Sequence, residues 1–354
     1  MIINMKKTVI VFCGGKSSEH QISIRSARSV WANLSENEFE KKLIAITVEG
    51  QFFWADPVVD LNQKSQFNDV DFKQHKKLEW VEFKQFDELC LFPVLHGPFY
   101  EDGSLQGLFE SLGHAYVGCD VKTSALCMDK VITKALLKTQ NIPVVDSLYF
   151  NHDDQWQDDE RLKKLHYPVF VKAASQGSSI GVYKSESYED ACQYIKKAFE
   201  FDQRVLVEQG IEGRELEMAY LEGHNESLNV VGEIIVNSSH YDFESKYNDP
   251  DQKLCQLAVD VELPEKILTK MKDYVSQAVH ILGIDSLARI DFFYDSKNEK
   301  LYINEINTMP GFTSISMYPK LIEKMGMNYS ALLSYLIELA DNRQQRKSLL
   351  KKTV

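Results

Sequence analysis

The chain has 354 residues, of which 44% are hydrophobic, so it can form two or three compact domains with sizeable cores. A formal net charge of −12 at pH 7 excludes a broad basic surface for nucleic acid, although a local basic cleft for a small anion is compatible with it. No apolar run reaches the roughly 18 residues of a membrane span, and residues 1–15 are more typical of a short strand than of a signal peptide. We therefore expect a cytoplasmic globular protein with no nucleic-acid or membrane partner.

The six cysteines are scattered along the chain, with no C-x-x-C pair and no histidine cluster at the spacing of a zinc site. We expect them to be reduced and mostly buried thiols. They are Cys13, Cys90, Cys119, Cys127, Cys192 and Cys255.

The first third of the chain alternates short apolar runs with amphipathic segments. Strands are predicted at 8–15, 41–50 and 88–97, and helices at 18–34 and 104–113. This alternation indicates a parallel sheet with helices on its faces. Ligands of such sheets bind where the strands end and the loops cluster.

The pattern changes after about residue 122. The segments, in order, are a helix at 125–141, a β-hairpin at 167–185, a helix at 188–201, and strands at 204–211, 214–223 and 229–236 that are typical of one antiparallel sheet. The charged end, 341–354, is predicted to be a helix that fades into a tail.

A second hairpin is predicted at 286–307, with its turn centred on Asn298. This register places Asp291 opposite Glu305 and Arg289 opposite Asn307, and period-two alternation puts these four side chains on one face. The other face is expected to enter the core. It carries Ile290, Phe292, Tyr294, Tyr302 and Ile306.

Two carboxylates and a carboxamide that converge need a cation between them. Oxygen ligands without histidine or cysteine favour a hard ion, Mg²⁺ or Mn²⁺. The alternative is structural: Arg289 pairs with a carboxylate and joins the two strands. A register slip of one residue would also move one set of side chains to the opposite face.

A metal held by so few protein groups commonly has phosphate among its other ligands. The segment around Lys16 is not a Walker A loop, because Ile10 stands where its first glycine belongs, and the absence of G-x-G-x-x-G excludes a Rossmann dehydrogenase. The better cradle is "VKAASQGSSIGV", with Lys172 on a strand and small residues, including Ser178 and Ser179, in the following loop.

The sequence suggests further nucleotide ligands, but each of these residues alone is weak evidence for a nucleotide site. Lys130 could hold a phosphate or be a solvated helix lysine, and Glu208, at the end of a strand, could accept from an adenine amino group. Glu208 and Glu215 could equally be ordinary edge-strand charges, and the Gly/Ser hairpin could be only a loop.

Taken in order, several motifs resemble the ATP-grasp superfamily and, within it, the D-alanine:D-alanine ligase family. The resemblance covers residue 8 to beyond 330. It rests on "GGKSSEHQISIRSA", "LHGPFYEDGSLQGLFE", "MDKVITK", "VKAASQGSSIGV", "EQGIEGRE", "YDFESKY", "ARIDFF" and "NEINTMPGFTSISMYP".

The resemblance implies an ATP-grasp fold, α/β and α+β, preceded by a Rossmann-like domain with a parallel sheet. It implies a substrate-binding domain at 1–122, a central ATP-grasp subdomain at 123–212 and a C-terminal one at 213–354 that holds the metal and catalytic residues. A homodimer is also implied.

The activity implied is the joining of two D-alanine molecules, with ATP and two Mg²⁺ (or Mn²⁺) ions, through an acyl phosphate, for peptidoglycan precursors. A D-lactate or D-serine acceptor and a non-catalytic ATP-binding regulator are the alternatives. Tyr247 and the intact metal set favour an amine acceptor and a working enzyme.

The roles implied by the resemblance divide into four groups. The catalytic group is Glu19, Ser178, Arg289 and Ser316; the substrate group is His96, Tyr247, Gly311 and Met317; the nucleotide group is Lys130, Lys172, Ser179, Glu208, Glu215 and Lys246; the metal group is Asp291, Glu305 and Asn307.

Some of these residues also have ordinary structural readings. Glu19 is a first-turn acid of a helix that Ser18 and Gln21 would cap as a capping box. Two positions depart from the family pattern: Tyr100 replaces a usual glycine, and Gln209 replaces a frequent lysine. The segment 241–253 is expected to be a lid that shields the acyl phosphate from water.

Overall fold

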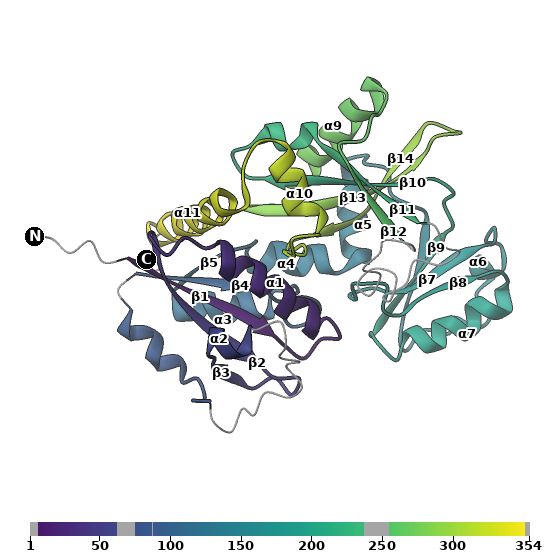
Figure 1. Ribbon diagram of the computed structural model, residues 1–354. Helices are drawn as coiled ribbons and strands as arrows, with labels where there is room; N and C mark the ends of the chain where they lie inside the picture. The colour runs from purple at the N-terminus through teal and green to yellow at the C-terminus, as the bar shows by residue number, and fades with distance from the viewer. Residues whose placement is uncertain (1–5, 62–74, 87, 237–254, 351–354) are drawn as a thin grey trace, which may run out of the picture.

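A computed structural model describes residues 6–61, 75–86, 88–236 and 255–350. Three sheets make up this part of the chain. In Figure 1 the first sheet (purple to blue) and the second (teal) lie apart, and the third lies above and between them. Within the described residues, no helix is both long enough and apolar enough to cross a bilayer.

The first sheet confirms the predicted strand and helix alternation. Its order is β3-β2-β1-β4-β5, and all neighbours are parallel except the edge strand β3. The elements are β1 (Lys7–Gly14), α1 (His20–Asn33), β2 (Phe39–Ile46), β3 (Phe52–Trp54), α2 (Pro57–Asp60), the 3₁₀ helix η3 (Trp80–Gln85), β4 (Leu89–Pro93), α3 (Ser104–Leu112) and β5 (Ala115–Tyr116).

Both faces of this sheet are buried, which explains the continuous apolar run of β1. Val9 and Val11 face a core that includes α1, whereas Ile10 and Phe12 face the core beneath α3. The polar loops at the carboxyl ends of β1 and β4 are therefore held by a rigid, two-sided core.

The helix predicted at 125–141 is two helices, α4 (Val121–Met128) and α5 (Lys130–Thr139). Asp129 has an extended conformation between them, and its carboxylate accepts from the backbone N–H groups of Val131 and Ile132. A side-chain cap of this kind starts a new helix at Lys130.

The second sheet has the order β6-β9-β7-β8 and is antiparallel throughout, and its β7–β8 pair confirms the hairpin predicted at 167–185. Its elements are β6 (Ser147–Asn151), α6 (Glu160–Lys163), β7 (Val169–Ala173), β8 (Val182–Ser185), α7 (Tyr188–Ala198) and β9 (Arg204–Gln209).

The third sheet is also antiparallel, with the order β12-β11-β10-β13-β14. It and the helices around it comprise β10 (Arg214–Leu221), η4 (Asn225–Asn229), β11 (Val231–Val236), β12 (Cys255–Val259), α9 (Glu265–Leu282), β13 (Leu287–Asp295), β14 (Lys300–Asn307), α10 (Met317–Lys324) and α11 (Tyr329–Ser348).

The prediction of one antiparallel sheet over 204–236 is wrong, because β9 belongs to the second sheet and β10 to the third. Two glycines mark the crossing. A Cβ on Gly210 would lie 2.6 Å from the Pro168 carbonyl oxygen, and one on Gly213 would lie 2.5 Å from that of Tyr294. The connection thus touches the backbone of each sheet in turn, at distances only glycine allows.

The register predicted for the 286–307 hairpin is confirmed where it matters: Asp291 pairs with Glu305, and Arg289 pairs with Asn307. A bulge follows, so that Phe292 pairs with Ile303 and Phe293 with Tyr302. The prediction that Tyr302 faces the core is therefore wrong. The irregularity shifts β14 by one residue and turns Leu301 and Ile303 inwards instead.

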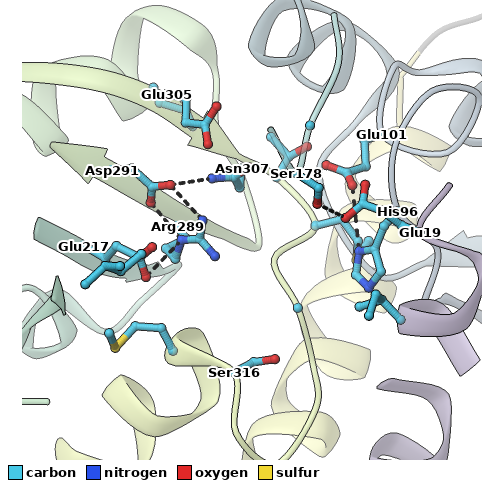
Figure 2. Close-up of a pocket in the computed structure, with 18 of the residues that line it drawn as sticks. Glu19, His96, Glu101, Ser178, Glu217, Arg289, Asp291, Glu305, Asn307 and Ser316 are labelled. Atoms are coloured by element: carbon cyan, nitrogen blue, oxygen red, sulfur yellow. Dashed lines mark hydrogen bonds and ion pairs between the residues drawn. The ribbon is translucent and has the colours of Figure 1, made fainter. Parts of the chain in front are cut away.

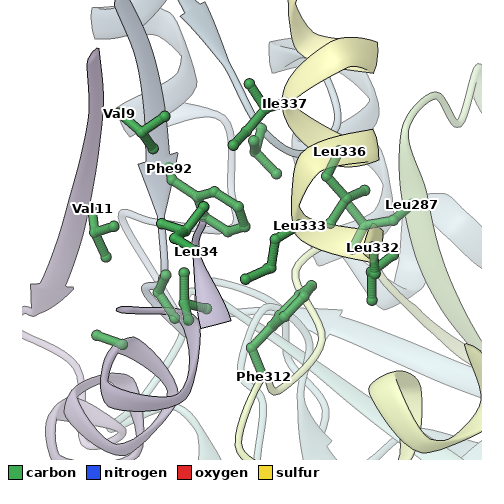
Figure 3. Packing of buried hydrophobic residues seen from close by; sticks show 14 of the residues in the cluster. Val9, Val11, Leu34, Phe92, Leu287, Phe312, Leu332, Leu333, Leu336 and Ile337 are labelled. Carbon is green, nitrogen blue, oxygen red and sulfur yellow. The ribbon is translucent and has the colours of Figure 1, made fainter. Parts of the chain in front are cut away.

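The last helix joins the first and third sheets. Leu332, Leu333, Leu336 and Ile337 of α11 pack with Phe312 against Val9, Val11 and Phe92 of the first sheet in one buried cluster (Figure 3). This shared core fixes the N-terminal sheet relative to β13, the strand that carries Arg289 and Asp291.

Arg343 of α11 anchors this junction through buried polar contacts. It is 6% exposed, donates to the carbonyl oxygens of Tyr116 and Gly118, and pairs with Asp285 at 3.1 Å. Burial raises the pKa of Asp285, and the Arg343 guanidinium acts in the opposite direction by favouring the charged carboxylate. The arginine thus compensates a carboxylate that would otherwise be costly to bury.

Replacing Arg343 by Ala is expected to destabilise the protein by about 3–5 kcal/mol, because it leaves Asp285 and two carbonyl groups without their donor. Thermal unfolding followed by circular dichroism measures this as a clear fall in Tm. Arg346→Ala, three residues further along the helix, removes an exposed arginine 3.7 Å from Glu222 and should change Tm little. Equal effects of the two substitutions would contradict the anchoring role.

Candidate active site

A cavity of about 490 Å³ lies where the loops of the three sheets meet. Most of the residues predicted for the site line it, and Figure 2 shows several of them around the opening. They are Glu19, His96, Lys130, Ser178, Glu215, Arg289, Asp291, Glu305, Asn307, Gly311, Ser316 and Met317. Lys246, Tyr247 and the predicted lid lie outside the described residues.

Asp291 and Glu305 face one another on β13 and β14, and the Asn307 amide donates to Asp291 Oδ2 at 3.0 Å. The Lys130 ammonium lies 3.6 Å from Glu305 Oε2. Among the described residues, no three acidic, histidine or cysteine side chains form a complete metal cage. Two carboxylates and one amide oxygen suit Mg²⁺ or Mn²⁺ whose remaining ligands come from phosphate or water.

The alternative role of Arg289, an ion pair, is also present: the arginine pairs with Asp291 on its own strand and with Glu217 on the neighbouring β10, rather than with a carboxylate of β14. Its Nε and Nη2 atoms donate to the two oxygens of Asp291, each at 2.7 Å. A metal on Asp291 would therefore compete with Arg289 for the same carboxylate.

Glu217 is a pocket residue that the sequence analysis missed. It lies on β10 directly opposite Asp291, is 2% exposed, and its Oε2 is 3.3 Å from Nε of Arg289. Burial opposes the charge of Arg289, but the two carboxylates raise its pKa well above the ordinary value. The alternation of Glu215, Leu216, Glu217 and Met218 is the signal that could have revealed it, since it puts both glutamates on one face.

Glu19 begins α1 as its N-cap residue and points into the cavity rather than capping the helix. The capping box predicted from Ser18 and Gln21 is wrong, because the helix starts at His20 and its N-cap side chain makes no capping bond. Instead, the Ser178 hydroxyl donates to Glu19 Oε1, so these two members of the predicted catalytic group meet although they are far apart in sequence (Figure 2).

The loop that presents Ser178 has an unusual backbone. Ser178 and Ser179 have φ values of +53° and +61°, in the left-handed region that non-glycine residues rarely adopt. Of the two, only Ser178 lines the cavity. The tight turn thus directs one serine hydroxyl towards Glu19.

His96 is buried beside two acids. Its Nδ1 lies 3.8 Å from Glu101 Oε1, and its Nε2 lies 3.4 Å from the Ser26 hydroxyl. Burial lowers the pKa of His96, but Glu101 and Glu19 outweigh it and raise the pKa above the ordinary value. Glu101 lines the cavity too, within a motif that the sequence analysis quoted without giving it a role.

Tyr100, which stands where the family usually has glycine, packs against the loop that follows β1, at Gly15 and Lys16. Its hydroxyl accepts from the Lys16 N–H at 3.0 Å, and a Cβ on Gly15 would lie 2.6 Å from its ring. The bulky residue is therefore accommodated by a glycine opposite it. The backbone of the His96 loop makes room through Phe99, with φ +74°.

Glu208 and Lys172 lie deeper than the cavity lining and form a cluster with Lys134, which the sequence analysis missed. Glu208 is 2% exposed, and its two oxygens lie 2.5 Å from the ammonium groups of Lys134 and Lys172. Burial opposes ionisation, but the two lysines lower the pKa of Glu208 to about 2. Lys134 follows Lys130 by one helical turn, a spacing equally typical of a solvated face.

At the far end of the cavity, Ser316 begins α10, and its hydroxyl lies 2.7 Å from that of Thr313. A Cβ on Gly311 would lie 2.8 Å from Ser316 Oγ, so a side chain there would require the Ser316 hydroxyl to move. Met317 is buried and would clash with a side chain at Gly232.

Gln209, the other residue that departs from the family pattern, lies on β9, and its side-chain amide donates to the His166 carbonyl at 2.6 Å.

The Glu208 cluster predicts a pH-dependent stability. The folded pKa of about 2 lies below the ordinary 4.5, so the contribution is complete above about pH 4.5 and is lost as the pH falls towards 2. It is on the order of 3 kcal/mol. Scanning calorimetry should show a lower Tm for Glu208→Gln at pH 6, and a difference from the wild type that narrows towards pH 3.

The matched control is Glu186→Gln, which breaks an exposed pair with Lys184 in the same sheet and should change Tm little at either pH. A Glu208→Gln deficit of constant size across the pH range would contradict the assignment of a low pKa.

The chain matches the family model described as the D-ala D-ala ligase N-terminus over residues 8–119, and that of the D-ala D-ala ligase C-terminus over residues 136–338. It is 39% identical to the D-alanine--D-alanine ligase of Caldicellulosiruptor bescii over 97% of this chain and 98% of that one.

Two solved structures are similar as well. The VanG D-Ala:D-Ser ligase from Enterococcus faecalis has a TM-score of 0.81 at 30% identity, covering 95% of this chain and 100% of that one. The D-alanine--D-alanine ligase from Bacillus anthracis complexed with ATP has a TM-score of 0.74 at 26% identity, covering 96% and 99%. With both family models matched in order along most of its length, the chain belongs to the D-alanine–D-alanine ligase family.

Proposed function

We propose that the chain joins two D-alanine molecules into D-alanyl-D-alanine, with conversion of ATP to ADP and phosphate, to supply peptidoglycan synthesis. One observation carries the proposal: a single cavity has an anionic end at Glu19 and, opposite it, Arg289 beside Asp291 and Glu305 (Figure 2). With a metal ion on Asp291 and Glu305, the second end of the cavity would be cationic. An amino acid has the complementary pair of charges, an ammonium for Glu19 and a carboxylate for Arg289 and the metal.

The first D-alanine is expected to place its ammonium against Glu19. Ser178 donates to the same carboxylate and fixes its orientation. The carboxylate of this substrate then lies towards Arg289, and it attacks the γ-phosphate of ATP to form an acyl phosphate and ADP.

The negative charge that gathers in this first step is the main obstacle. Asp291, Glu305 and Asn307 would hold Mg²⁺ or Mn²⁺, which offsets the charge of the phosphates. Lys130, which bonds the Gln176 carbonyl at 2.6 Å, is placed between the Gly/Ser loop and Glu305 and adds a positive charge there. Lys172 and the undescribed Lys246 are proposed as further phosphate ligands.

In the second step the amine of the second D-alanine attacks the acyl carbon, and phosphate leaves. Arg289 and the Gly311 N–H are proposed to stabilise the developing oxyanion, a role in which the loss of one donor typically costs about 10²–10³ in rate. The second substrate would bind at Ser316 and Met317, with Tyr247 contributing from outside the described residues.

The nucleotide base is expected near Glu208, and the ribose near Glu215. Both oxygens of Glu208 are paired with lysines, and a shift of Lys172 towards the phosphates would open an acceptor site for the adenine amino group. The segments 1–122, 123–212 and 213–354 are proposed as the structural units, and a cytoplasmic homodimer is proposed as the working form.

The acceptor is the point where a second function has support, because one similar structure is named a D-Ala:D-Ser ligase. Phosphate release should be measured with ATP, Mg²⁺ and D-alanine, and then with D-serine or D-lactate added. We expect release that depends on D-alanine alone, with D-alanyl-D-alanine as the product seen by mass spectrometry. No D-alanine-dependent release would refute the ligase proposal, and a mixed product would identify the alternative acceptor.

Glu305→Gln and Asp291→Asn should each reduce kcat by about 10² or more, since each weakens the ligand set that offsets phosphate charge. Both proteins should unfold cooperatively near the wild-type Tm. Asp273→Asn, an exposed carboxylate on α9, is the matched control and should leave the rate unchanged. Near-normal rates in both site variants would show that the metal assignment is wrong.

A further inference from the structure

Glu217 belongs to a row of three carboxylates that crosses the third sheet. The registers place Glu217 opposite Asp291 and Asp291 opposite Glu305, on β10, β13 and β14. Directly opposite residues on neighbouring strands have Cβ atoms about 4.5–5.5 Å apart, so these like charges repel one another unless cations lie between them.

Arg289 supplies the cation between the first two members of the row. Its neighbours in the next row are Ala219 on β10 and Asn307 on β14. Because Ala219 carries only a methyl group, the guanidinium can lie beside Glu217 as well as Asp291, as Figure 2 shows. Nε is 2.7 Å from Asp291 Oδ1 and 3.3 Å from Glu217 Oε2.

The proposed function demands two things of this group that conflict. Asp291 must give oxygen atoms to a metal ion, while Arg289 must stay in place, although Asp291 now binds both Nε and Nη2. A buried guanidinium that loses its only carboxylate costs several kcal/mol. Glu217 removes the conflict, since it is a second carboxylate already beside Nε.

We propose that Glu217 is a positioning residue that holds Arg289 by Nε when Asp291 binds the metal, so that the arginine keeps facing the reacting carboxyl group. This inference rests on the proposed ligase function. It assigns to Glu217 no contact with substrate or metal, only with Arg289.

The consequence is a coupling between Glu217 and metal affinity that passes through Arg289. In Glu217→Gln, Asp291 is the only carboxylate in the described part of the chain that still accepts from the Arg289 guanidinium, so the metal must displace the arginine from it. Binding of Mn²⁺ in the presence of ADP, measured from the electron paramagnetic resonance signal of free Mn²⁺, should weaken about 10- to 100-fold, since one displaced charged hydrogen bond is worth about 1.5–3 kcal/mol.

The decisive comparison uses Arg289→Ala as a second background. In Arg289→Ala no guanidinium competes with the metal for Asp291, so adding Glu217→Gln should not weaken Mn²⁺ binding further. Weakening of equal size on both backgrounds would overturn the proposal, because it would make Glu217 a direct metal ligand. Glu217→Asp, which keeps the charge, should restore much of the affinity lost in Glu217→Gln.

Turnover gives an independent readout. For Glu217→Gln we expect kcat to fall by about 10², the cost of a reacting group misplaced by about 1 Å, with an unchanged KM for ATP. Glu233→Gln is the control: it breaks a pair with Arg214 in the same sheet, at 2.7 Å, outside the cavity lining. It should match the wild type in kcat and Mn²⁺ affinity.

The two hypotheses fail in different ways. A wild-type protein without D-alanine-dependent phosphate release would refute the ligase function, whereas an active wild type with Glu217→Gln indistinguishable from Glu233→Gln would refute the positioning role alone. A cooperative unfolding transition in each variant shows that the comparison is made between folded proteins.

Discussion

The structure of the site depends on one constraint: a buried charge must have a partner of opposite sign. In two buried clusters of this site the positive and negative charges do not balance. Glu217, Arg289 and Asp291 carry one more negative than positive charge, and Lys134, Glu208 and Lys172 carry one more positive than negative. The excess in the first suits a metal ion and that in the second suits a phosphate. A metal–nucleotide complex would balance both at once, which is a physical reason for the two to bind together.

The parts of the candidate site that could be predicted from sequence are those that lie on one strand or hairpin. Asp291, Glu305, Asn307 and Arg289 share a face because a strand alternates with period two, and this pattern is visible in a single segment. The bulge beyond Asp291 was not visible, because a shifted register leaves an apolar run almost unchanged, and so Tyr302 was assigned to the wrong face.

Glu217 and Lys134 were missed for a related reason. Each is an ordinary residue for its element, and only its partner on another segment makes it part of the site. The Ser178–Glu19 contact is of the same kind: Glu19 precedes α1 and Ser178 lies in the loop between β7 and β8, so no local pattern predicts that they meet, and only the resemblance to the family placed both in one group. The break at Asp129 was hidden because both helices around it have good helical sequences.

The cores indicate how the cavity is assembled. The first and third sheets share one apolar cluster through α11, whereas the second sheet has a cluster of its own within residues 150–207. At the cavity, the contacts of this sheet with the rest of the chain are polar ones, such as Ser178 with Glu19 and the Gln176 carbonyl with Lys130 of α5. Polar contacts of this kind exchange with ligand groups at little cost, whereas a shared apolar core does not. We therefore expect the unit that carries the Gly/Ser loop to be the one that adjusts to the nucleotide, while α11 keeps Glu19 and Arg289 at a fixed separation.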